Sequence, residues 1–434
     1  MENIKAKQAK KNIVVVGGGF AGLKFAQHMF NNKYYNVTLI DKNNYNFFTP
    51  LLYQVATGFL DASSISYPFR KLFRDKGIHF RLAEVVRVDT EKQIVYLDEG
   101  EIHYDHLVFA AGAKANFFGN ESVRANAISL KGMEDALFMR NELIKTVEKA
   151  SIESDPAERR RLLTVVVAGG GATGVEVAGM LAEMKNNIIE KDYPELKGVN
   201  GQILVVDGNS VLLAPMSEKT HKETYNALIG LGVKIKLNTR VMSFTNDQVC
   251  LSDGEVVETK TLIWCAGIIA HTFAGIPESS LGIGNRMKTD NFNRVHRLDN
   301  VYAIGDISVQ QTDDLYPKGH PQLAQPAIQQ GRTLARNFIT IAKGNIPTPF
   351  KYFDRGDMAI VGRHHAVADL FKNKLHLSGF LGLLGWLFIH LISLVNYDNK
   401  IKTLYEWIVA YLTKDQALRM MFKHKEVSKP LDTN

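Results

Sequence analysis

Two glycine-rich motifs hold the residues best suited to chemistry in this chain. Each motif reads G-x-G-x-x-G and directly follows a run of β-branched residues, the first over 17–22 and the second over 169–174. In this pattern one glycine makes a tight turn, one lets the backbone approach a pyrophosphate, and one lets the following helix pack on the strand. The phosphates then lie at the N-terminus of that helix. Two such motifs predict two dinucleotides bound by one chain.

A carboxylate follows each motif at the end of the next apolar strand. Asp41 ends the segment 36–41, and Asp207 ends the segment 202–207. A carboxylate at this point accepts hydrogen bonds from an adenosine ribose and repels a 2′-phosphate. Because the two residues after Asp207 bring no arginine, the second site is expected to prefer a dinucleotide whose ribose has a free 2′-hydroxyl. A glycine-rich turn can also be a plain connection between strand and helix, but two motifs that each have a carboxylate argue against that alternative.

The order of the remaining apolar segments predicts that one domain is nested inside another. Segments 107–113 and 262–268 are strands that end in small residues at equivalent places of the two halves. The segment 300–306 ends in Gly-Asp and fits neither glycine unit by spacing, so we expect it to return to the first domain. A turn that caps a helix is the plainer alternative for Gly305 and Asp306. The predicted class is α/β, with two nested Rossmann-like dinucleotide-binding domains plus a C-terminal helical membrane-anchoring region.

Composition excludes several classes of protein. The chain of 434 residues is long enough for more than one domain. Its two cysteines, Cys250 and Cys265, form neither a disulfide framework nor a redox pair, which indicates a reducing cytoplasm. The lysine-rich segment 1–12 lacks the apolar core of a signal peptide and is expected to be a solvated arm. The net charge is +7, but the basic residues are dispersed, so we expect no nucleic-acid partner, and we expect no metal site.

The C-terminal stretch is apolar enough to meet a membrane. Segment 375–397 contains no Asp, Glu, Lys or Arg and has the length of a spanning helix. Segment 401–425 is amphipathic, with lysines around its apolar face, as in a helix that lies in a membrane interface. A helix buried against a partner subunit is the alternative. Small residues in the first segment recur at helical spacing and could pack on the protein: Ser378, Gly382, Gly385 and Ser393. We therefore expect a monotopic anchor rather than a span, and a homodimer is left open.

Taken together, these segments resemble the type II NADH dehydrogenases, the single-subunit NADH:quinone oxidoreductases among flavoproteins with two dinucleotide-binding domains. The resemblance rests on segment 46–58 (NFFTPLLYQVATG), on segment 324–329 (AQPAIQ) and on the apolar tail from Gly379, and it covers nearly the whole chain. It implies non-covalent FAD on the first motif, NADH as substrate on the second, and a quinone as acceptor. The implied domains are FAD-binding (1–118 and 286–349), NADH-binding (119–285) and C-terminal membrane-anchoring with quinone access (350–434).

The resemblance also implies site residues at matching positions. For FAD these are Gly17, Gly19, Phe20, Ala21, Gly22, Asp41, Lys42, Thr49, Pro50, Gln54, Ala111, Gly112, Asp306, Ala324 and Gln325. For NADH they are Gly169, Gly171, Gly174, Glu176, Asp207, Ala266 and Gly267. The implied catalytic residues are Glu176, Gln325 and Gln329.

Each implied catalytic residue has a plainer reading. Glu176 would lie near the nicotinamide, although a helix dipole alone favours a carboxylate in a first turn. Gln325 and Gln329 are four residues apart, so they share a helix face that would border the flavin and quinone pocket, but surface glutamines are common. One departure is visible, because Lys400 stands where the family tends to have an arginine. A lysine keeps the charge but loses bidentate contacts.

The implied activity is FAD-dependent oxidation of NADH with two-electron reduction of a membrane quinone, where electrons enter a respiratory chain. It would take place on the cytoplasmic side of the cell membrane and without proton pumping, since nothing resembles a bundle of proton-carrying helices. Menaquinone and ubiquinone are both open. The alternatives are a sulfide:quinone oxidoreductase, which needs reactive cysteines, a ferredoxin-type reductase, which would lack the apolar tail, and a non-catalytic flavoprotein that senses NADH.

Overall fold

The computed structural model describes residues 10–199, 201–371, 373–413 and 418–421, so most of the predicted arm over 1–12 lies outside the described residues. The chain divides into two compact units. Unit 1 is Met1–Phe48, Ser66–Asn116 and Gly267–Gly356, and unit 2 is Thr49–Ile65, Phe117–Ala266 and Asp357–Asn434. Both units therefore combine segments that are far apart in the sequence.

Unit 1 contains most of the strands that surround the first glycine motif. Its strands are β1 (Lys11–Val16), β2 (Tyr35–Asp41), β3 (Tyr45–Phe47), β4 (Ser66–Pro68), β5 (Ile78–Leu82), β6 (Val85–Asp89), β7 (Ile94–Leu97), β8 (Glu101–His103), β9 (His106–Phe109), β10 (Ala113–Ala115), β19 (Ile268–Ala270), β20 (Met287–Thr289), β21 (Val301–Ala303) and β22 (Ser308–Gln310). Its helices are α1 (Phe20–His28), α4 (Phe69–Leu72) and α11 (Ala324–Ala342).

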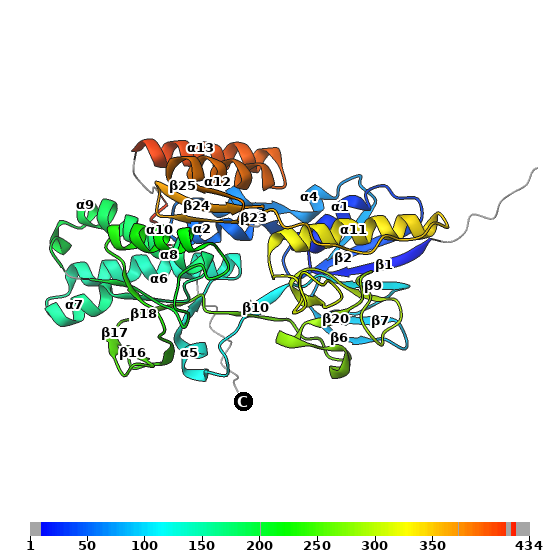
Figure 1. The fold of residues 1–434 in the computed structure, drawn as a ribbon, viewed down its shortest axis with the longest axis horizontal. Coiled ribbons are helices and arrows are strands. Elements are labelled where there is room, and N and C mark those ends of the chain that lie inside the picture. Colours follow the sequence, from blue (N-terminus) through cyan, green and yellow to red (C-terminus); the bar gives the residue numbers. More distant parts are fainter. Residues whose placement is uncertain (1–9, 200, 372, 414–417, 422–434) are drawn as a thin grey trace, which may run out of the picture. The chain divides into compact units, whose positions relative to one another are not determined.

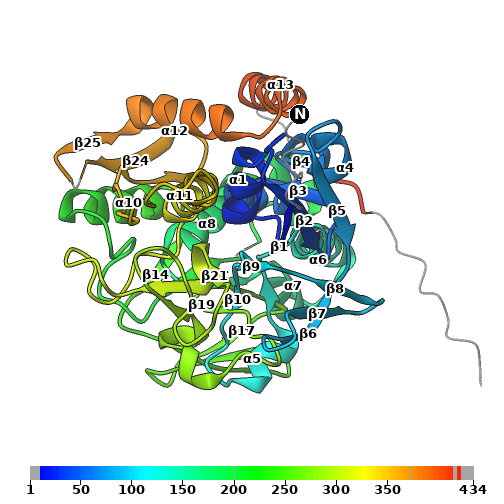
Figure 2. The same ribbon diagram turned by 90° about the vertical axis from the view of Figure 1, so that its right-hand side faces the viewer.

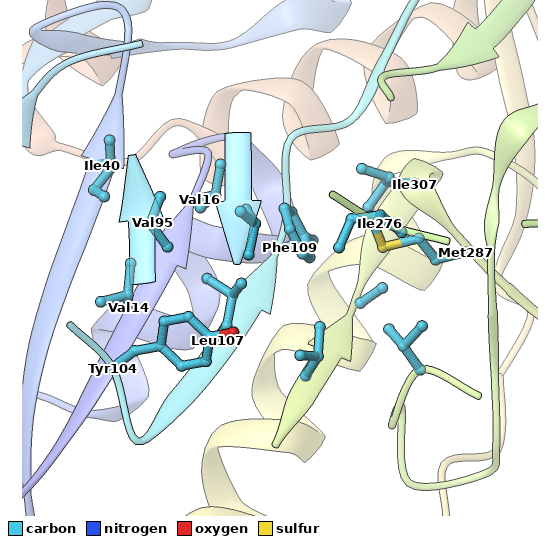
Figure 3. Packing of buried hydrophobic residues seen from close by; sticks show 14 of the residues in the cluster. Val14, Val16, Ile40, Val95, Tyr104, Leu107, Phe109, Ile276, Met287 and Ile307 are labelled. Carbon is cyan, nitrogen blue, oxygen red and sulfur yellow. The ribbon is translucent and has the colours of Figure 1, made fainter. Parts of the chain in front are cut away.

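The main sheet of unit 1 is parallel, in the order β21-β9-β1-β2-β5. Val301 of β21 pairs with Leu107 of β9, which confirms that the Gly-Asp segment returns to the first domain. Helices α1 and α11 pack together, as Figure 2 shows. An apolar cluster joins Val14, Leu107 and Phe109 of the main sheet to Val95 of β7 (Figure 3). Burial of these alternating side chains fixes the register of β1 and β9.

Unit 2 repeats this arrangement around the second motif. Its strands are β11 (Ile128–Ser129), β12 (Val165–Ala168), β13 (Ile203–Val206), β14 (Lys234–Lys236), β15 (Val241–Thr245), β16 (Gln248–Leu251), β17 (Val256–Glu258), β18 (Thr261–Trp264), β23 (Gly356–Val361), β24 (His365–Leu370) and β25 (Leu375–Ser378). Its helices are α2 (Leu52–Ala56), α3 (Ala62–Ile65), α5 (Glu121–Asn126), α6 (Met133–Ile152), α7 (Pro156–Leu163), α8 (Ala172–Met184), α9 (Glu190–Asp192), α10 (Glu218–Gly230), α12 (Gly379–Ser393) and α13 (Tyr397–Thr413). Its parallel sheet has the order β11-β18-β12-β13-β14.

The apolar segment 375–397 is a strand followed by a helix. Residues 375–378 form β25, which pairs antiparallel with β24, and α12 starts at Gly379, whose φ of 61° breaks the strand. Helix α12 packs on β24 and lies beside α13 (Figure 1). Of the predicted small face only Gly382 is buried, where an added Cβ would lie 2.5 Å from the Ala366 carbonyl oxygen, whereas Ser393 is exposed. The prediction of a small packing face is therefore wrong for Ser393, whereas the large side chain of Trp386 on the same helix is fully buried.

The amphipathic segment 401–425 is helical over a shorter range than predicted. Helix α13 begins at Tyr397 and is described to Thr413; residues 414–417 and 422–425 lie outside the described residues. Residues 418–421 are not helical, and Arg419 forms a 2.6 Å ion pair with Asp192. Within the described ranges, no helix combines the length and apolar character needed to cross a bilayer.

Candidate functional site

The first glycine motif forms a cradle with a backbone that only glycine permits. Gly17 has a φ of 101°, and an added Cβ there would lie 2.6 Å from the carbonyl oxygen of Ala110 and 2.7 Å from Cα of Ala111. An added Cβ on Gly22 would lie 1.9 Å from the Gly17 carbonyl oxygen. On Gly19 it would meet no atom of the described residues within 4 Å. The loop is thus packed from behind and open in front, which is the shape that a pyrophosphate needs.

Asp41 holds the motif from the end of β2. One of its carboxylate oxygens accepts a 2.6 Å hydrogen bond from the Gly18 N–H and the other a 2.8 Å bond from the Asn43 N–H. Burial raises the pKa of Asp41, and these two hydrogen bonds oppose that rise. Lys42 beside it is exposed. The carboxylate is therefore oriented next to the open side of the loop.

Other predicted residues of unit 1 gather around this cradle. Gly305, next to Asp306, has a φ of 75°, and an added Cβ there would lie 3.1 Å from Cβ of Ala21. Phe20 begins α1, and Ala324 begins α11. Gly112 follows β9, and an added Cβ on it would meet no described atom within 4 Å. The returning strand thus brings Asp306 to the N-terminus of α1.

Two residues of this cradle were not among the predicted site residues. The amide oxygen of Gln330 accepts a 2.6 Å hydrogen bond from the Gly305 N–H. The amide of Asn46 donates a 2.8 Å bond to the Gly18 carbonyl. Asn46 lies inside segment 46–58 and Gln330 directly follows segment 324–329, but nothing in their spacing indicated these contacts.

The second motif has the same geometry. Gly169 has a φ of 111°, and an added Cβ on Gly174 would lie 1.8 Å from the Gly169 carbonyl oxygen. On Gly171 it would meet no described atom within 4 Å. Asp207 accepts hydrogen bonds from the Gly170 and Asn209 N–H groups, as Asp41 does from Gly18 and Asn43 in unit 1. The sequence repeat is therefore a repeat of individual hydrogen bonds.

Ala266 and Gly267 follow β18, as Ala111 and Gly112 follow β9. An added Cβ on Gly169 would lie 2.8 Å from the Ala266 nitrogen, so Ala266 borders the second cradle. Gly267 belongs to unit 1, where its carbonyl accepts a 3.1 Å hydrogen bond from the Asn116 N–H. The structure thus brings one member of this predicted pair to the second cradle.

Glu176 is a buried side chain on α8. Burial raises its pKa well above the ordinary value, although the Ile360 N–H donates a hydrogen bond to the carboxyl group. Attraction to a helix dipole requires an ionised carboxylate. Burial therefore favours the neutral form of the carboxyl group. Glu176 also lies beyond the first turn of α8, which begins at Ala172, and the dipole effect falls off within that turn.

Thr49, Pro50 and Gln54 belong to unit 2. Gln54 is buried on α2, where its amide oxygen accepts a 2.8 Å hydrogen bond from the indole of Trp407 and its amide nitrogen donates a 2.9 Å bond to the Tyr53 hydroxyl. Thr49 is exposed. The carboxamide of Gln54 thus ties α2 to α13 within unit 2.

Gln325 and Gln329 lie on one face of α11, as predicted, and both bind backbone. Gln329 donates a 2.9 Å hydrogen bond to the Phe353 carbonyl and accepts a 3.0 Å bond from the Phe353 N–H. Gln325 donates a 2.7 Å bond to the Gly356 carbonyl and accepts a 3.3 Å bond from the Arg355 N–H. The two amides therefore hold segment 353–356 on the helix.

Cys265 does not have the surroundings of a reactive thiol. Burial raises the pKa of Cys265 to about 12, and Cys250 is a free, partly buried residue of β16. A thiol reacts as its thiolate, which such a pKa disfavours.

Among the described residues, no group of three or more His, Cys, Asp or Glu side chains could hold a metal ion. Lys400 places its ammonium group 5.3 Å from the centre of the Tyr397 ring.

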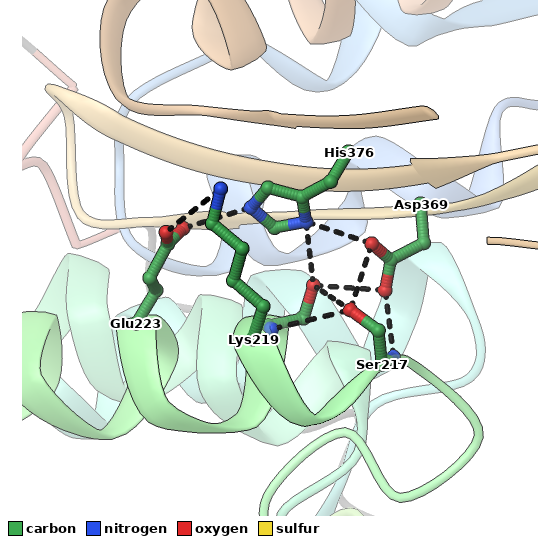
Figure 4. Close-up of polar contacts among 6 residues, drawn as sticks. Ser217, Lys219, Glu223, Asp369 and His376 are labelled. Carbon is green, nitrogen blue, oxygen red and sulfur yellow. Dashed lines mark hydrogen bonds and ion pairs between the residues drawn. The ribbon is translucent and has the colours of Figure 1, made fainter. Parts of the chain in front are cut away.

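A partly buried polar network links α10 to β24 and β25 (Figure 4). Asp369 accepts a 2.7 Å hydrogen bond from the Ser217 N–H and a 2.8 Å bond from the Thr220 hydroxyl. His376 lies between two carboxylates, with Nδ1 2.8 Å from Asp369 and Nε2 3.0 Å from Glu223. Burial tends to raise the pKa of Asp369, but the hydrogen bonds outweigh it and hold the pKa below its ordinary value.

Asp369→Asn should destabilise the protein at pH 7 by about 2 kcal/mol, because an amide would direct a donor at groups that donate to the carboxylate. The lowered pKa gives the wild type stability above pH 3.8, the ordinary value, that is lost as the pH falls through the folded-state pKa. Urea unfolding at several pH values should therefore give the variant a lower free energy of unfolding than the wild type. This difference should become smaller as the pH falls. Asp314→Asn, on an exposed carboxylate, is the control. A deficit of the same size at every pH would contradict the prediction.

Comparisons with known protein sequences identify the family. A sequence model of the pyridine nucleotide-disulphide oxidoreductases matches residues 11–331. The type II NADH:quinone oxidoreductases Ndh and NdhA of Mycobacterium tuberculosis are each 32% identical to this chain over 93% of its length, and the matches cover 89% and 87% of those proteins.

Solved structures share the fold. The structure of NDH2 from Plasmodium falciparum in complex with NADH has a TM-score of 0.87 at 22% identity, and covers 96% of this chain and 100% of its own. The sulfide:quinone oxidoreductase from Aquifex aeolicus has a TM-score of 0.71 at 19% identity, with 93% and 96% covered.

Proposed function

Because the chain belongs to the type II NADH:quinone oxidoreductases, within the pyridine nucleotide-disulphide oxidoreductases, we propose that it oxidises NADH with FAD as cofactor and reduces a quinone by two electrons. The observation that supports this most strongly is the pair of equivalent glycine cradles. Each cradle has open space beside its middle motif glycine and one carboxylate that backbone hydrogen bonds hold next to it. Two dinucleotides in one chain are what an electron transfer from NADH to FAD requires.

The first cradle is the proposed FAD site. Gly17, Gly19 and Gly22 would hold the pyrophosphate, Asp41 the adenosine ribose, and Asp306 the ribityl or pyrophosphate region. When bound, FAD accepts two electrons from NADH and passes them on. Remaining residues of the proposed site are Phe20, Ala21, Lys42, Thr49, Pro50, Gln54, Ala111, Gly112, Ala324 and Gln325. The proposed FAD-binding domain is 1–118 with 286–349.

The second cradle is the proposed NADH site, within a proposed domain of 119–285. Gly169, Gly171 and Gly174 would hold the pyrophosphate, and Asp207 would accept hydrogen bonds from the ribose. We assign Glu176 to the nicotinamide end, where a neutral carboxyl group can donate a hydrogen bond without leaving a charge buried. Ala266 and Gly267 complete the proposed set.

Gln325 and Gln329 are assigned to the acceptor side. Since both amides bind the backbone of 353–356, we propose that they act by holding this segment in place for the quinone. Two hydrogen bonds per amide fix the segment without any charge. Lys400 supplies a positive charge near the start of α13.

The region 350–434 is the proposed membrane contact. Helices α12 and α13 expose many large apolar side chains: Phe380, Leu381, Leu384, Phe388, Ile389, Ile392, Ile401, Leu404, Tyr405, Ile408 and Leu412. We call this set the apolar helix face. Patches of this kind mark membrane or protein contacts, and lysines nearby favour anionic lipids. We propose a monotopic attachment on the cytoplasmic side of the cell membrane, with electrons entering a respiratory chain and no ion pumped; a homodimer is the other use of this face.

An anaerobic titration tests the activity. Adding NADH to the purified yellow protein should bleach the flavin absorbance, and adding a short-chain quinone should restore it. If quinone leaves the flavin reduced, the proposed acceptor is wrong. If the flavin bleaches but turnover is negligible, a protein that senses NADH explains the cradles better. Oxidation of sulfide is less supported, because the pKa of Cys265 disfavours a thiolate.

A further inference from the structure

We infer that Arg240 is a specificity residue at the adenosine end of the second cradle, where it lets the enzyme use NADPH as a weaker alternative to NADH. This inference rests on the proposed function and deepens it. Sequence reasoning expected no arginine near Asp207, because it considered only the next two residues. The structure supplies one from a segment more than thirty positions further along the chain.

The backbone fixes the position of Arg240. The Asp207 N–H donates a 2.9 Å hydrogen bond to the Lys236 carbonyl, and the Thr239 N–H donates a 3.0 Å bond to the Asp207 carbonyl. The Arg240 N–H donates a 2.9 Å bond to the Ser252 hydroxyl, whose own N–H donates a 2.8 Å bond to the Arg240 carbonyl. The segment that carries Arg240 is therefore tied directly to the strand end that carries Asp207.

The side chain of Arg240 crosses Gly208, the residue after Asp207. An added Cβ on Gly208 would lie 3.2 Å from Nε and 3.3 Å from Cγ of Arg240. Arg240 is exposed and forms no ion pair with any residue that the structure describes. A guanidinium group is therefore available beside the carboxylate that receives the ribose.

The first cradle shows that the fold does not require an arginine here. In unit 1 the Ala83 N–H donates to the Asp41 carbonyl, the Glu84 N–H donates to the Asp98 carboxylate, and the Asp98 N–H donates to the Glu84 carbonyl. These bonds match those of Thr239, Arg240 and Ser252 one for one. The equivalent of Arg240 is thus Glu84, and the equivalent of Gly208 is Lys42. At the same backbone position one unit carries an acid and the other a base.

The chemistry of the two nucleotides explains the difference. The proposed ligand of the first cradle, FAD, has an adenosine ribose without a phosphate. A second carboxylate there, that of Glu84, therefore repels no charge on the ligand. NADPH has a 2′-phosphate, which Asp207 repels and which a guanidinium group can bind through two parallel hydrogen bonds. Arg240 therefore offsets part of the repulsion by Asp207. The preference for NADH remains, because the carboxylate is still present.

Steady-state kinetics with a short-chain quinone test this inference. Arg240→Met should lower kcat/KM for NADPH by about tenfold or more, because a charge-assisted hydrogen bond is lost. The value for NADH should fall by no more than about threefold, with the change in KM rather than kcat, since Arg240 is remote from the reacting atoms. Arg240→Lys should keep part of the NADPH activity. Lys234→Met, on the exposed side of β14, removes the same charge and should change neither nucleotide.

A binding measurement separates this inference from the proposed function. Calorimetry with ADP-ribose and with 2′-phospho-ADP-ribose requires no turnover. Arg240→Met should weaken only the phosphorylated ligand, by about tenfold or more. Equal losses for both ligands, or no loss for the phosphorylated one, would overturn the role of Arg240. If Arg240→Met weakens only the phosphorylated ligand but the wild-type enzyme fails to reduce a quinone, the proposed acceptor is wrong and the role of Arg240 stands.

Discussion

Gly171→Val should give a protein that binds FAD and folds normally but is reduced by NADH about a hundredfold more slowly or worse. The backbone at Gly171 is extended, with a φ of −75°, and an added Cβ would meet no described atom within 4 Å. The fold can therefore accept a branched side chain, whereas a pyrophosphate that must approach this backbone cannot. Stopped-flow bleaching of the flavin by NADH measures the effect.

Gly19→Val is the matched change in the other cradle. Its backbone is also extended, with a φ of −69°, and its Cβ would also point into open space. This variant should purify without FAD while keeping its cooperative unfolding. The pair tests which motif holds which dinucleotide. A colourless Gly171→Val protein together with a yellow Gly19→Val protein would reverse the assignment.

Alanine at the last glycine of either motif would be a poorer experiment. An added Cβ on Gly174 would lie 1.8 Å from the Gly169 carbonyl oxygen, and on Gly22 it would lie 1.9 Å from the Gly17 carbonyl oxygen. Such overlaps force the helix away from its strand. Loss of activity there would report misfolding rather than loss of a ligand contact.

The double variant Phe388→Glu with Leu412→Glu should lower partitioning onto anionic phospholipid vesicles about a hundredfold or more. The two side chains belong to the apolar helix face and are 62% and 80% exposed. Burial of one such side chain is worth about 1.5–3 kcal/mol, so losing two removes enough free energy for this effect. Vesicle sedimentation measures the bound fraction.

Two controls make the membrane prediction specific. Phe138→Glu replaces an aromatic residue of α6 that is 55% exposed and lies outside the apolar helix face, so it should bind vesicles normally. The double variant should keep its melting temperature and its activity with a short-chain quinone. Unchanged vesicle binding, with a changed oligomeric state instead, would assign the face to a subunit contact.

Truncation before α12 would not be a clean test of membrane attachment. Trp386 and Trp407 are buried at 0% and 3% exposure, and the Trp407 indole donates to buried Gln54. Removing them would expose apolar surface of α2 and leave an amide oxygen without its donor. Substitutions on the exposed face avoid this damage.

Local sequence determined the two cradles and the fold around them. The glycines, the β-branched strands before them, and Asp41 and Asp207 after them act through neighbours in the same strand–helix–strand unit, so their spacing already specifies the geometry. The family resemblance drawn from segments 46–58 and 324–329 is confirmed by the relatives. The return of β21 to the first sheet followed from the same reasoning.

Contacts between distant segments were decided only by the tertiary structure. No spacing rule predicts that Arg240 crosses Gly208, that Trp407 binds Gln54, or that Gln325 and Gln329 hold the backbone of 353–356. Likewise, apolar composition could not separate β25 from α12, because pairing with β24 rather than hydropathy makes residues 375–378 a strand. The sequence alone therefore predicted a dinucleotide site in each half, since those signals are local. Packing of remote segments decided which further side chains meet those sites.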